Sequence, residues 1–113
     1  MAEEPVMASL MKVIAERKAQ TSGKPSYVAT LMKGGAAAIG AKIIEEAAEV
    51  VEASDEPGDS GREHLVKEVA DLVFHASVLL GYRDLDWSDV EAELKRRFGT
   101  SGLVEKASRK PKS

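Results

Sequence analysis

Apolar residues recur along this chain at the three- and four-residue spacing that is typical of amphipathic helices. Glycine and proline clusters divide the pattern into segments. The predicted helices cover residues 6–19, a short stretch 26–32 that Gly34 and Gly35 end, and then 36–54, 61–80 and 87–98. No segment alternates apolar and polar residues convincingly, as a strand would. We therefore predict an all-α fold.

The two longest predicted helices are joined by a short turn at 55–59, which favours an antiparallel helical hairpin. Ser60 and Glu63 after the turn are typical of a capping box. Helix 61–80 is apolar around nearly its whole circumference, a pattern typical of a helix buried on most sides. One chain of 113 residues has too few other helices to cover it. We therefore expect a dimer, with the hairpin core completed as a helix bundle.

Acidic residues form two clusters, one on each helix of this hairpin. They read E-E-x-x-E at Glu45, Glu46 and Glu49, and E-x-x-D at Glu68 and Asp71. Residues three apart lie on one face of a helix. If the two helices face each other, four carboxylates would therefore surround one point: Glu46, Glu49, Glu68 and Asp71. An oxygen-rich set of this kind suits Mg²⁺ or Mn²⁺. Glu45 is better placed for a second cation, the attacking water or the substrate.

Other interpretations of the acids stay open. The first cluster could be an ordinary solvated face, and the second could be held in salt bridges by Lys42 and Lys67. The metal site is favoured because Asp71 falls on a helix predicted to be buried, where a carboxylate must be paired, metal-bound or protonated. His75 is interpreted as a core or interface histidine with a satisfied hydrogen bond. Tyr27 is interpreted as a packing residue rather than a base-stacking platform, and so is Trp87.

Charge is spread unevenly along the chain. Residues 1–94 carry 9 Lys/Arg and 18 Asp/Glu, whereas residues 95–113 carry 7 Lys/Arg and one Glu. We expect one domain over 1–113 with a basic C-terminal tail from about 99. Such a tail can bind nucleic acid or the phosphates of a small ligand, or it can simply be a solvated terminus.

The composition excludes several chemistries. There is no cysteine, hence no disulfide, thiolate zinc site or cysteine nucleophile, which fits a reducing cytoplasm. No run approaches the ~18 apolar residues of a membrane span, and the acidic first residues do not resemble a secretory signal. We expect a cytoplasmic protein with no membrane or nucleic-acid partner.

The acidic motifs resemble the signature of the MazG-like all-α nucleotide pyrophosphohydrolases. Within that group the chain resembles the phosphoribosyl-ATP pyrophosphohydrolase family over roughly residues 10–110. The stretches that carry the resemblance are Glu16 to Lys18, Ser26-Tyr27 with Leu31, Lys42 to Val51, Glu68 to Leu72 with His75, Arg96-Arg97, Gly99 to Leu103 and Glu105 to Arg109. Val28 stands where the family often has Thr, and Val104 where an acidic residue is usual.

The resemblance implies hydrolysis of the α–β phosphoanhydride of phosphoribosyl-ATP, giving phosphoribosyl-AMP and pyrophosphate in histidine biosynthesis. It implies Mg²⁺, with Mn²⁺ as an alternative, as cofactor. The site residues it implies are Glu46, Glu49, Glu68 and Asp71 for the metal, Glu45, Glu46 and Glu49 for catalysis, and Lys42, Tyr27, Arg97, Lys106 and Arg109 for the substrate. The cyclohydrolase of the next step, which needs a thiolate zinc site, must be a separate chain.

Two alternative functions remain open from the sequence. A house-cleaning pyrophosphatase of non-standard or deoxy-NTPs would share the metal site without needing the tail. A non-catalytic helical dimerisation module would carry the same acids and bind no metal.

Overall fold

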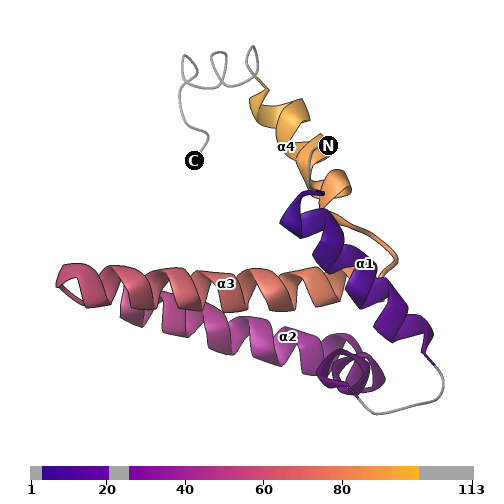
Figure 1. The fold of residues 1–113 in the computed structure, drawn as a ribbon, viewed down its shortest axis with the longest axis horizontal. Helices are drawn as coiled ribbons and strands as arrows, with labels where there is room; N and C mark the ends of the chain where they lie inside the picture. The colour runs from indigo at the N-terminus through magenta and orange to yellow at the C-terminus, as the bar shows by residue number, and fades with distance from the viewer. Residues whose placement is uncertain (1–3, 21–25, 100–113) are drawn as a thin grey trace, which may run out of the picture.

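The computed structural model describes residues 4–20 and 26–99, which form four helices. They are α1 (Val6–Ala19), α2 (Tyr27–Ala53), α3 (Gly58–Tyr82) and α4 (Trp87–Phe98). No strand occurs in these two ranges, so the predicted all-α class is confirmed. Helices α2 and α3 lie side by side as an antiparallel hairpin, α1 crosses one end of it, and α4 extends away from it (Figure 1).

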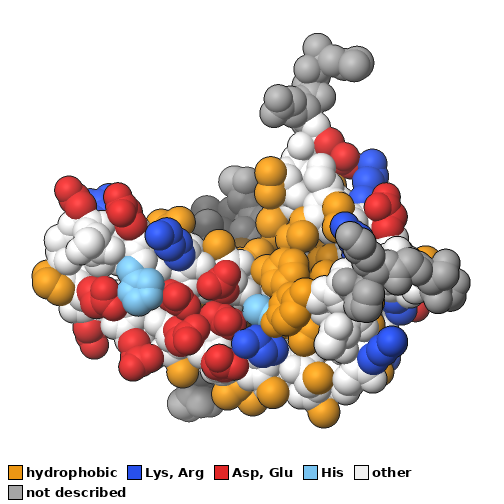
Figure 2. Space-filling view, turned by 60° about the horizontal axis from the view of Figure 1, so that its bottom comes forward, with side chains coloured by type: hydrophobic (Ala, Val, Ile, Leu, Met, Phe, Trp, Pro, Cys, Tyr) orange, Lys and Arg blue, Asp and Glu red, His pale blue; other side chains and the backbone are white. Residues whose placement is uncertain are grey.

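The hydrophobic core lies where α1 crosses the hairpin. Its buried members are Met11 and Ile14 of α1, Val28, Leu31 and Ile39 of α2, and Val78 of α3. Gly81 lets α1 approach closely, because a Cβ at that position would lie 2.5 Å from Cγ2 of Ile14. The half of the hairpin that lies away from α1 is outside this core cluster and carries the acidic motifs (Figure 2).

Helix α2 is kinked at Gly35, where the sequence predicted the end of a separate short helix. Gly35 has φ 70° and ψ −165°, a conformation that is essentially restricted to glycine. The helix begins under an N-cap at Ser26, whose hydroxyl oxygen accepts the N–H of Ala29 at 3.0 Å. The kink turns this first segment back toward α3 and brings Tyr27 against His75.

The predicted capping box at Ser60 and Glu63 is wrong. Helix α3 begins earlier, at Gly58, and its N-cap residue Pro57 makes no side-chain cap. Gly58 takes a positive φ of 74°, which lets the chain enter the helix before Ser60 is reached. In contrast, the bounds predicted for α4 match the observed ones. Its capping box is formed by Asp86 and Asp89.

In one chain, α3 is not buried on most sides as predicted. Its Val66 and Val69 are exposed, and so are Ile44 and Val51 of α2, at 73% and 67%. The reason is that, of the described helices, only α1 and α2 pack substantially on α3, which leaves part of its surface uncovered by them. We call these four residues the exposed apolar set. Of the helices described, none is long and apolar enough to cross a membrane.

Candidate metal site

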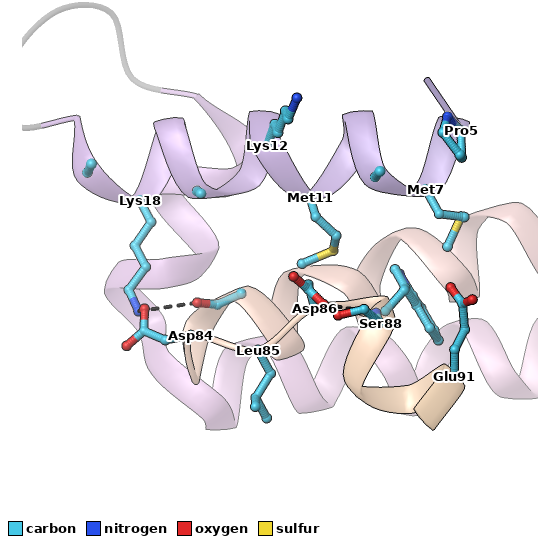
Figure 3. Close-up of a pocket in the computed structure, with 15 residues that line it drawn as sticks. Pro5, Met7, Met11, Lys12, Lys18, Asp84, Leu85, Asp86, Ser88 and Glu91 are labelled. Carbon is cyan, nitrogen blue, oxygen red and sulfur yellow. Dashed lines mark hydrogen bonds and ion pairs between the residues drawn. The ribbon is translucent and has the colours of Figure 1, made fainter. Parts of the chain in front are cut away.

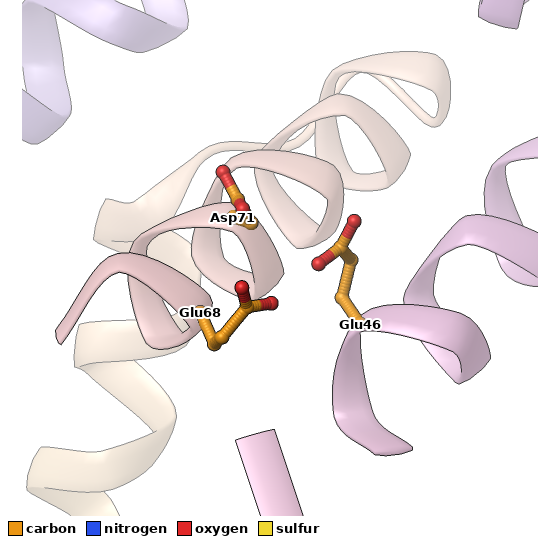
Figure 4. A group of neighbouring side chains, drawn as sticks. All are labelled: Glu46, Glu68 and Asp71. Carbon is orange, nitrogen blue, oxygen red and sulfur yellow. The ribbon is translucent and has the colours of Figure 1, made fainter. Parts of the chain in front are cut away.

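Three carboxylates from the two motifs converge between the hairpin helices. Glu46 reaches across from α2, and Glu68 and Asp71 project from α3 toward it (Figure 4). One oxygen from each lies within 4.8 Å of the others. The helical spacing of the motifs places these three on facing sides of the hairpin, whereas Glu49, the fourth residue predicted to converge, is not among them. This geometry can offer three oxygen ligands to one hard cation.

The three acids differ in burial. Glu46 is only 7% exposed, and the Glu68 side chain is 15% exposed. Asp71 is exposed, which corrects the expectation that it is buried: among the described elements only α1 and α2 pack substantially on α3, so one chain does not enclose the cluster. The Oε2 atoms of Glu46 and Glu68 are buried and have no hydrogen-bond partner among residues 4–20 and 26–99. A bound cation would remove that cost.

Burial and mutual repulsion make ionisation of this cluster unfavourable. Burial is the largest cause that raises the pKa of Glu46 from its ordinary 4.5 to about 7, followed by contact with the Glu49 carboxyl and the charges of Asp71 and Glu68. Burial and Glu49 also raise the pKa of Glu68. Glu49 therefore adjoins the cluster, although it is not among the three converging residues. A cation would offset all of these effects.

Within the described residues, lysine and arginine side chains do not neutralise the cluster. In the described ranges, no Lys or Arg forms an ion pair with Glu46, Glu68 or Asp71. Lys42 instead pairs with the exposed Glu45 at 3.2 Å, and this contact raises the pKa of Lys42. The salt-bridge interpretation of the acids through Lys42 and Lys67 is therefore not supported.

His64 is a neighbour of the cluster that the sequence interpretation missed. Its Nε2 lies 3.2 Å from Oε1 of Glu68, and its Nδ1 lies 2.7 Å from Oε2 of Glu56. The carboxylate of Glu56 is the first of the causes that raise the pKa of His64. The four-residue spacing between His64 and Glu68 was the signal that could have identified this pair.

The metal-free protein is expected to lose stability as pH rises from about 5 to about 8. Between about 4.5 and about 7, folded Glu46 holds a proton that the unfolded chain has released, so the free energy of unfolding falls with pH. The raised pKa of His64 acts in the same direction above its ordinary 6.5. Urea unfolding in EDTA at the two ends of this range measures the effect. A constant or rising stability would contradict the crowded-carboxylate description.

The predicted core role of His75 matches its surroundings. It is 5% exposed, with Nδ1 2.8 Å from the backbone oxygen of Asp71 and Nε2 2.6 Å from the Tyr27 hydroxyl. Tyr27 is 50% exposed and its ring stacks on Phe74 with centroids 6.1 Å apart. Trp87 is partly buried against the core and donates its ring N–H to Ser77, so it is a packing residue.

The remaining predicted substrate contacts are not assembled within the described chain. Arg97 lies on α4, apart from the hairpin in Figure 1, and pairs with Glu93 at 3.1 Å. Lys106 and Arg109 lie outside the described residues. The structure therefore brings Lys42 and Tyr27 near the acids but not Arg97.

A separate pocket of about 780 Å³ lies between α1, the end of α3 and the start of α4 (Figure 3). Met7 and Met11 of α1 and Trp87 of α4 are among the residues that line it. The Lys18 ammonium is already bonded to Asp84 at 2.8 Å and to two backbone carbonyls. No member of the carboxylate cluster lines this pocket, so it is distinct from the candidate metal site.

Fold and site together define an all-helical protein with a carboxylate cluster of the kind that can hold a divalent cation. The family model for phosphoribosyl-ATP pyrophosphohydrolase matches residues 7–98. The chain belongs to this family, as its motifs indicated.

Named relatives cover nearly the whole chain. It is 52% identical over 103 residues to the phosphoribosyl-ATP pyrophosphatase of Rhodopirellula baltica, covering 91% of this chain and 85% of the relative. It is 50% identical over 107 residues to the protein of the same name from Geobacter metallireducens, covering 94% of each. It is 47% identical over 106 residues to the phosphoribosyl-ATP pyrophosphatase of Neisseria meningitidis serogroup B, covering 94% of this chain and 95% of the relative.

Proposed function

We propose that this chain hydrolyses the α–β phosphoanhydride of phosphoribosyl-ATP, releasing phosphoribosyl-AMP and pyrophosphate in histidine biosynthesis. The observation that carries the proposal is the convergence of Glu46, Glu68 and Asp71, with two buried oxygens that lack a partner. Family membership narrows the substrate to the one in the relatives' name. The absence of cysteine suits the reducing cytoplasm, where we place the protein.

The cofactor we propose is Mg²⁺, with Mn²⁺ able to replace it. Glu46, Glu68 and Asp71 would hold the ion and Glu49 would complete the set, because hard cations favour carboxylate oxygens. When bound, the ion would supply charge neutralisation at the phosphate oxygens and a favourable position for water.

Other side chains would then act on the water and the phosphates. Exposed Glu45 is the general base we propose for the water proton, and its partner Lys42 would bind phosphate. Arg97, Lys106 and Arg109 are the further phosphate ligands. Because Arg97 stands apart from the acids of its own chain, we assign its contact to a site in a neighbouring subunit.

A homodimer is the proposed assembly, and a separate cyclohydrolase would consume the product. The exposed apolar set gives the reason for the dimer. Ile44 and Val51 lie two helical turns apart on one face of α2, and Val66 and Val69 share a face of α3. Water contact with these side chains is costly, and a second copy would remove it.

Light scattering at micromolar concentration is expected to give a dimer. The double variant Ile44→Lys/Val51→Lys should raise the dimer dissociation constant at least about 100-fold, since each aliphatic side chain contributes about 1.5–3 kcal/mol when buried. Val6→Lys is the matched control, because Val6 is 79% exposed but lies on α1. A monomeric wild type, or dissociation by Val6→Lys alone, would contradict the proposed interface.

Pyrophosphate release from a substrate panel tests the function. We expect phosphoribosyl-ATP to be hydrolysed far faster than any deoxynucleoside triphosphate, and EDTA to stop the reaction. A preference for deoxy- or non-standard nucleotides would favour the house-cleaning alternative. No hydrolysis of any member, together with no metal binding, would favour a non-catalytic dimerisation module.

A further inference from the structure

Tyr27 and His75 join the start of α2 to the candidate metal site. The two residues come from different hairpin helices, and the kink at Gly35 lets them meet. In an unkinked helix, Tyr27 and Lys42 would lie about 22 Å apart along the axis, at about 1.5 Å per residue. In the kinked helix, the Tyr27 phenol lies close enough to Lys42 to affect its pKa, although the effect of Glu45 is larger.

The two hydrogen bonds of His75 have fixed directions. The backbone oxygen of Asp71, 2.8 Å from Nδ1, can only accept, so Nδ1 carries a proton. In the neutral ring Nε2 is then an acceptor. The Tyr27 hydroxyl, 2.6 Å away, must donate its single proton to Nε2. Because this proton is engaged, the Tyr27 oxygen can offer a ligand only its lone pairs. Half of the Tyr27 residue stays exposed.

An acceptor at this position discriminates between parts of a nucleotide. Ionised phosphate oxygens have no proton to donate, and two facing acceptors repel each other. Sugar hydroxyls and the amino group of a base can donate. The phosphates have their own attractive groups nearby, namely the Lys42 ammonium and a cation at the carboxylates.

We propose that Tyr27 accepts a hydrogen bond from a hydroxyl or amino group of the phosphoribosyl-nucleoside part of the substrate, and that His75 is the positioning residue that holds its proton away from the ligand. This assignment rests on the proposed function, and it makes Tyr27 a specificity contact rather than a phosphate ligand. The Asp71 backbone that anchors His75 belongs to a residue of the carboxylate cluster, so the contact is tied to the site.

Nitrogen-15 NMR of the imidazoles tests the direction of the bonds without any substrate. The chain has two histidines, so the His64→Gln variant shows the imidazole signals of His75 only. At about pH 8 we expect a proton on Nδ1, which faces the Asp71 carbonyl, and none on Nε2, which faces the Tyr27 hydroxyl. Tyr27→Phe should keep this tautomer and shift only the Nε2 resonance. A proton on Nε2 would overturn the proposal.

Calorimetric binding of the two products tests the contact itself. Tyr27→Phe should raise the Kd of phosphoribosyl-AMP about 3- to 10-fold, the effect of one hydrogen bond, and leave the Kd of pyrophosphate with Mg²⁺ unchanged. Tyr82→Phe makes the same chemical change at the far end of α3 and should alter neither value. Far-UV circular dichroism checks that both variants fold.

The outcomes separate this proposal from the function on which it rests. Weaker pyrophosphate binding by Tyr27→Phe would assign Tyr27 to the phosphates or to metal-bound water, and would overturn the proposal. An unchanged Kd for both products would also overturn the proposal. A wild-type protein that binds both products but does not hydrolyse phosphoribosyl-ATP would count against the proposed function alone.

Discussion

Glu46→Gln is expected to abolish Mg²⁺-dependent pyrophosphate release and to leave the metal-free protein at least as stable as the wild type. Glutamine keeps the shape of the side chain but removes the charge of a proposed metal ligand. The rate should therefore fall at least about 100-fold, because losing even a residue that only supports a metal ligand costs about 10- to 100-fold. The same change removes a carboxylate whose pKa is raised to about 7 by burial and by its acidic neighbours. Its repulsion of Glu68 and Asp71 is lost with it.

A pyrophosphate-release assay and thermal melts in EDTA measure the two sides of this prediction. Glu52→Gln is the matched control, because Glu52 is exposed on the same helix and does not belong to the cluster. Asp71→Asn should reduce activity similarly, with a smaller effect on stability because Asp71 is exposed. Near-normal activity of Glu46→Gln, or a melt well below wild type, would contradict the metal-site account.

Gly35→Ala is expected to destabilise the fold by about 1–3 kcal/mol, the cost of forcing a side chain into a conformation that is essentially restricted to glycine. The new Cβ would also lie 3.3 Å from the Tyr82 hydroxyl. If the helix straightened to relieve this strain, Tyr27 would lose its contact with His75. Urea unfolding followed by circular dichroism measures the change.

Gly40→Ala provides the contrast within the same helix. Gly40 has no positive φ, and a Cβ there would meet nothing within 4 Å. Alanine is the better helix former by about 0.5–1 kcal/mol, so this variant should be neutral or more stable. If the two variants behaved alike, the kink at Gly35 would not be required by the fold.

Local signals in the sequence were sufficient for most helix boundaries. Helix α4 has the predicted bounds, since Asp86 caps its start and Gly99 follows its end. The start of α3 was harder to predict. Pro57 rather than Ser60 is the N-cap residue, because Gly58 adopts a positive φ that starts the helix earlier. The continuity of α2 through Gly35 depends on tertiary contacts of the first segment, such as that of Tyr27 with His75.

The candidate site was partly predictable for a similar reason. Helical spacing places Glu46, Glu68 and Asp71 on facing sides of a hairpin, so their convergence follows from the pattern once the two helices are antiparallel. The pattern does not say how much of each helix a single chain covers, and the exposure of Asp71 was therefore missed. Only the family resemblance implied a substrate contact for Arg97, and in one chain this residue lies on a separate helix, α4.

Calorimetric titration of Mg²⁺ or Mn²⁺ into the wild type decides whether the carboxylate cluster holds a metal ion. We predict saturable binding, accompanied at about pH 6 by proton release, because Glu46 with its pKa of about 7 must ionise to bind the ion. The proton release should largely disappear at about pH 8. Absence of metal binding at both pH values would contradict the assignment of the carboxylate cluster as the metal site.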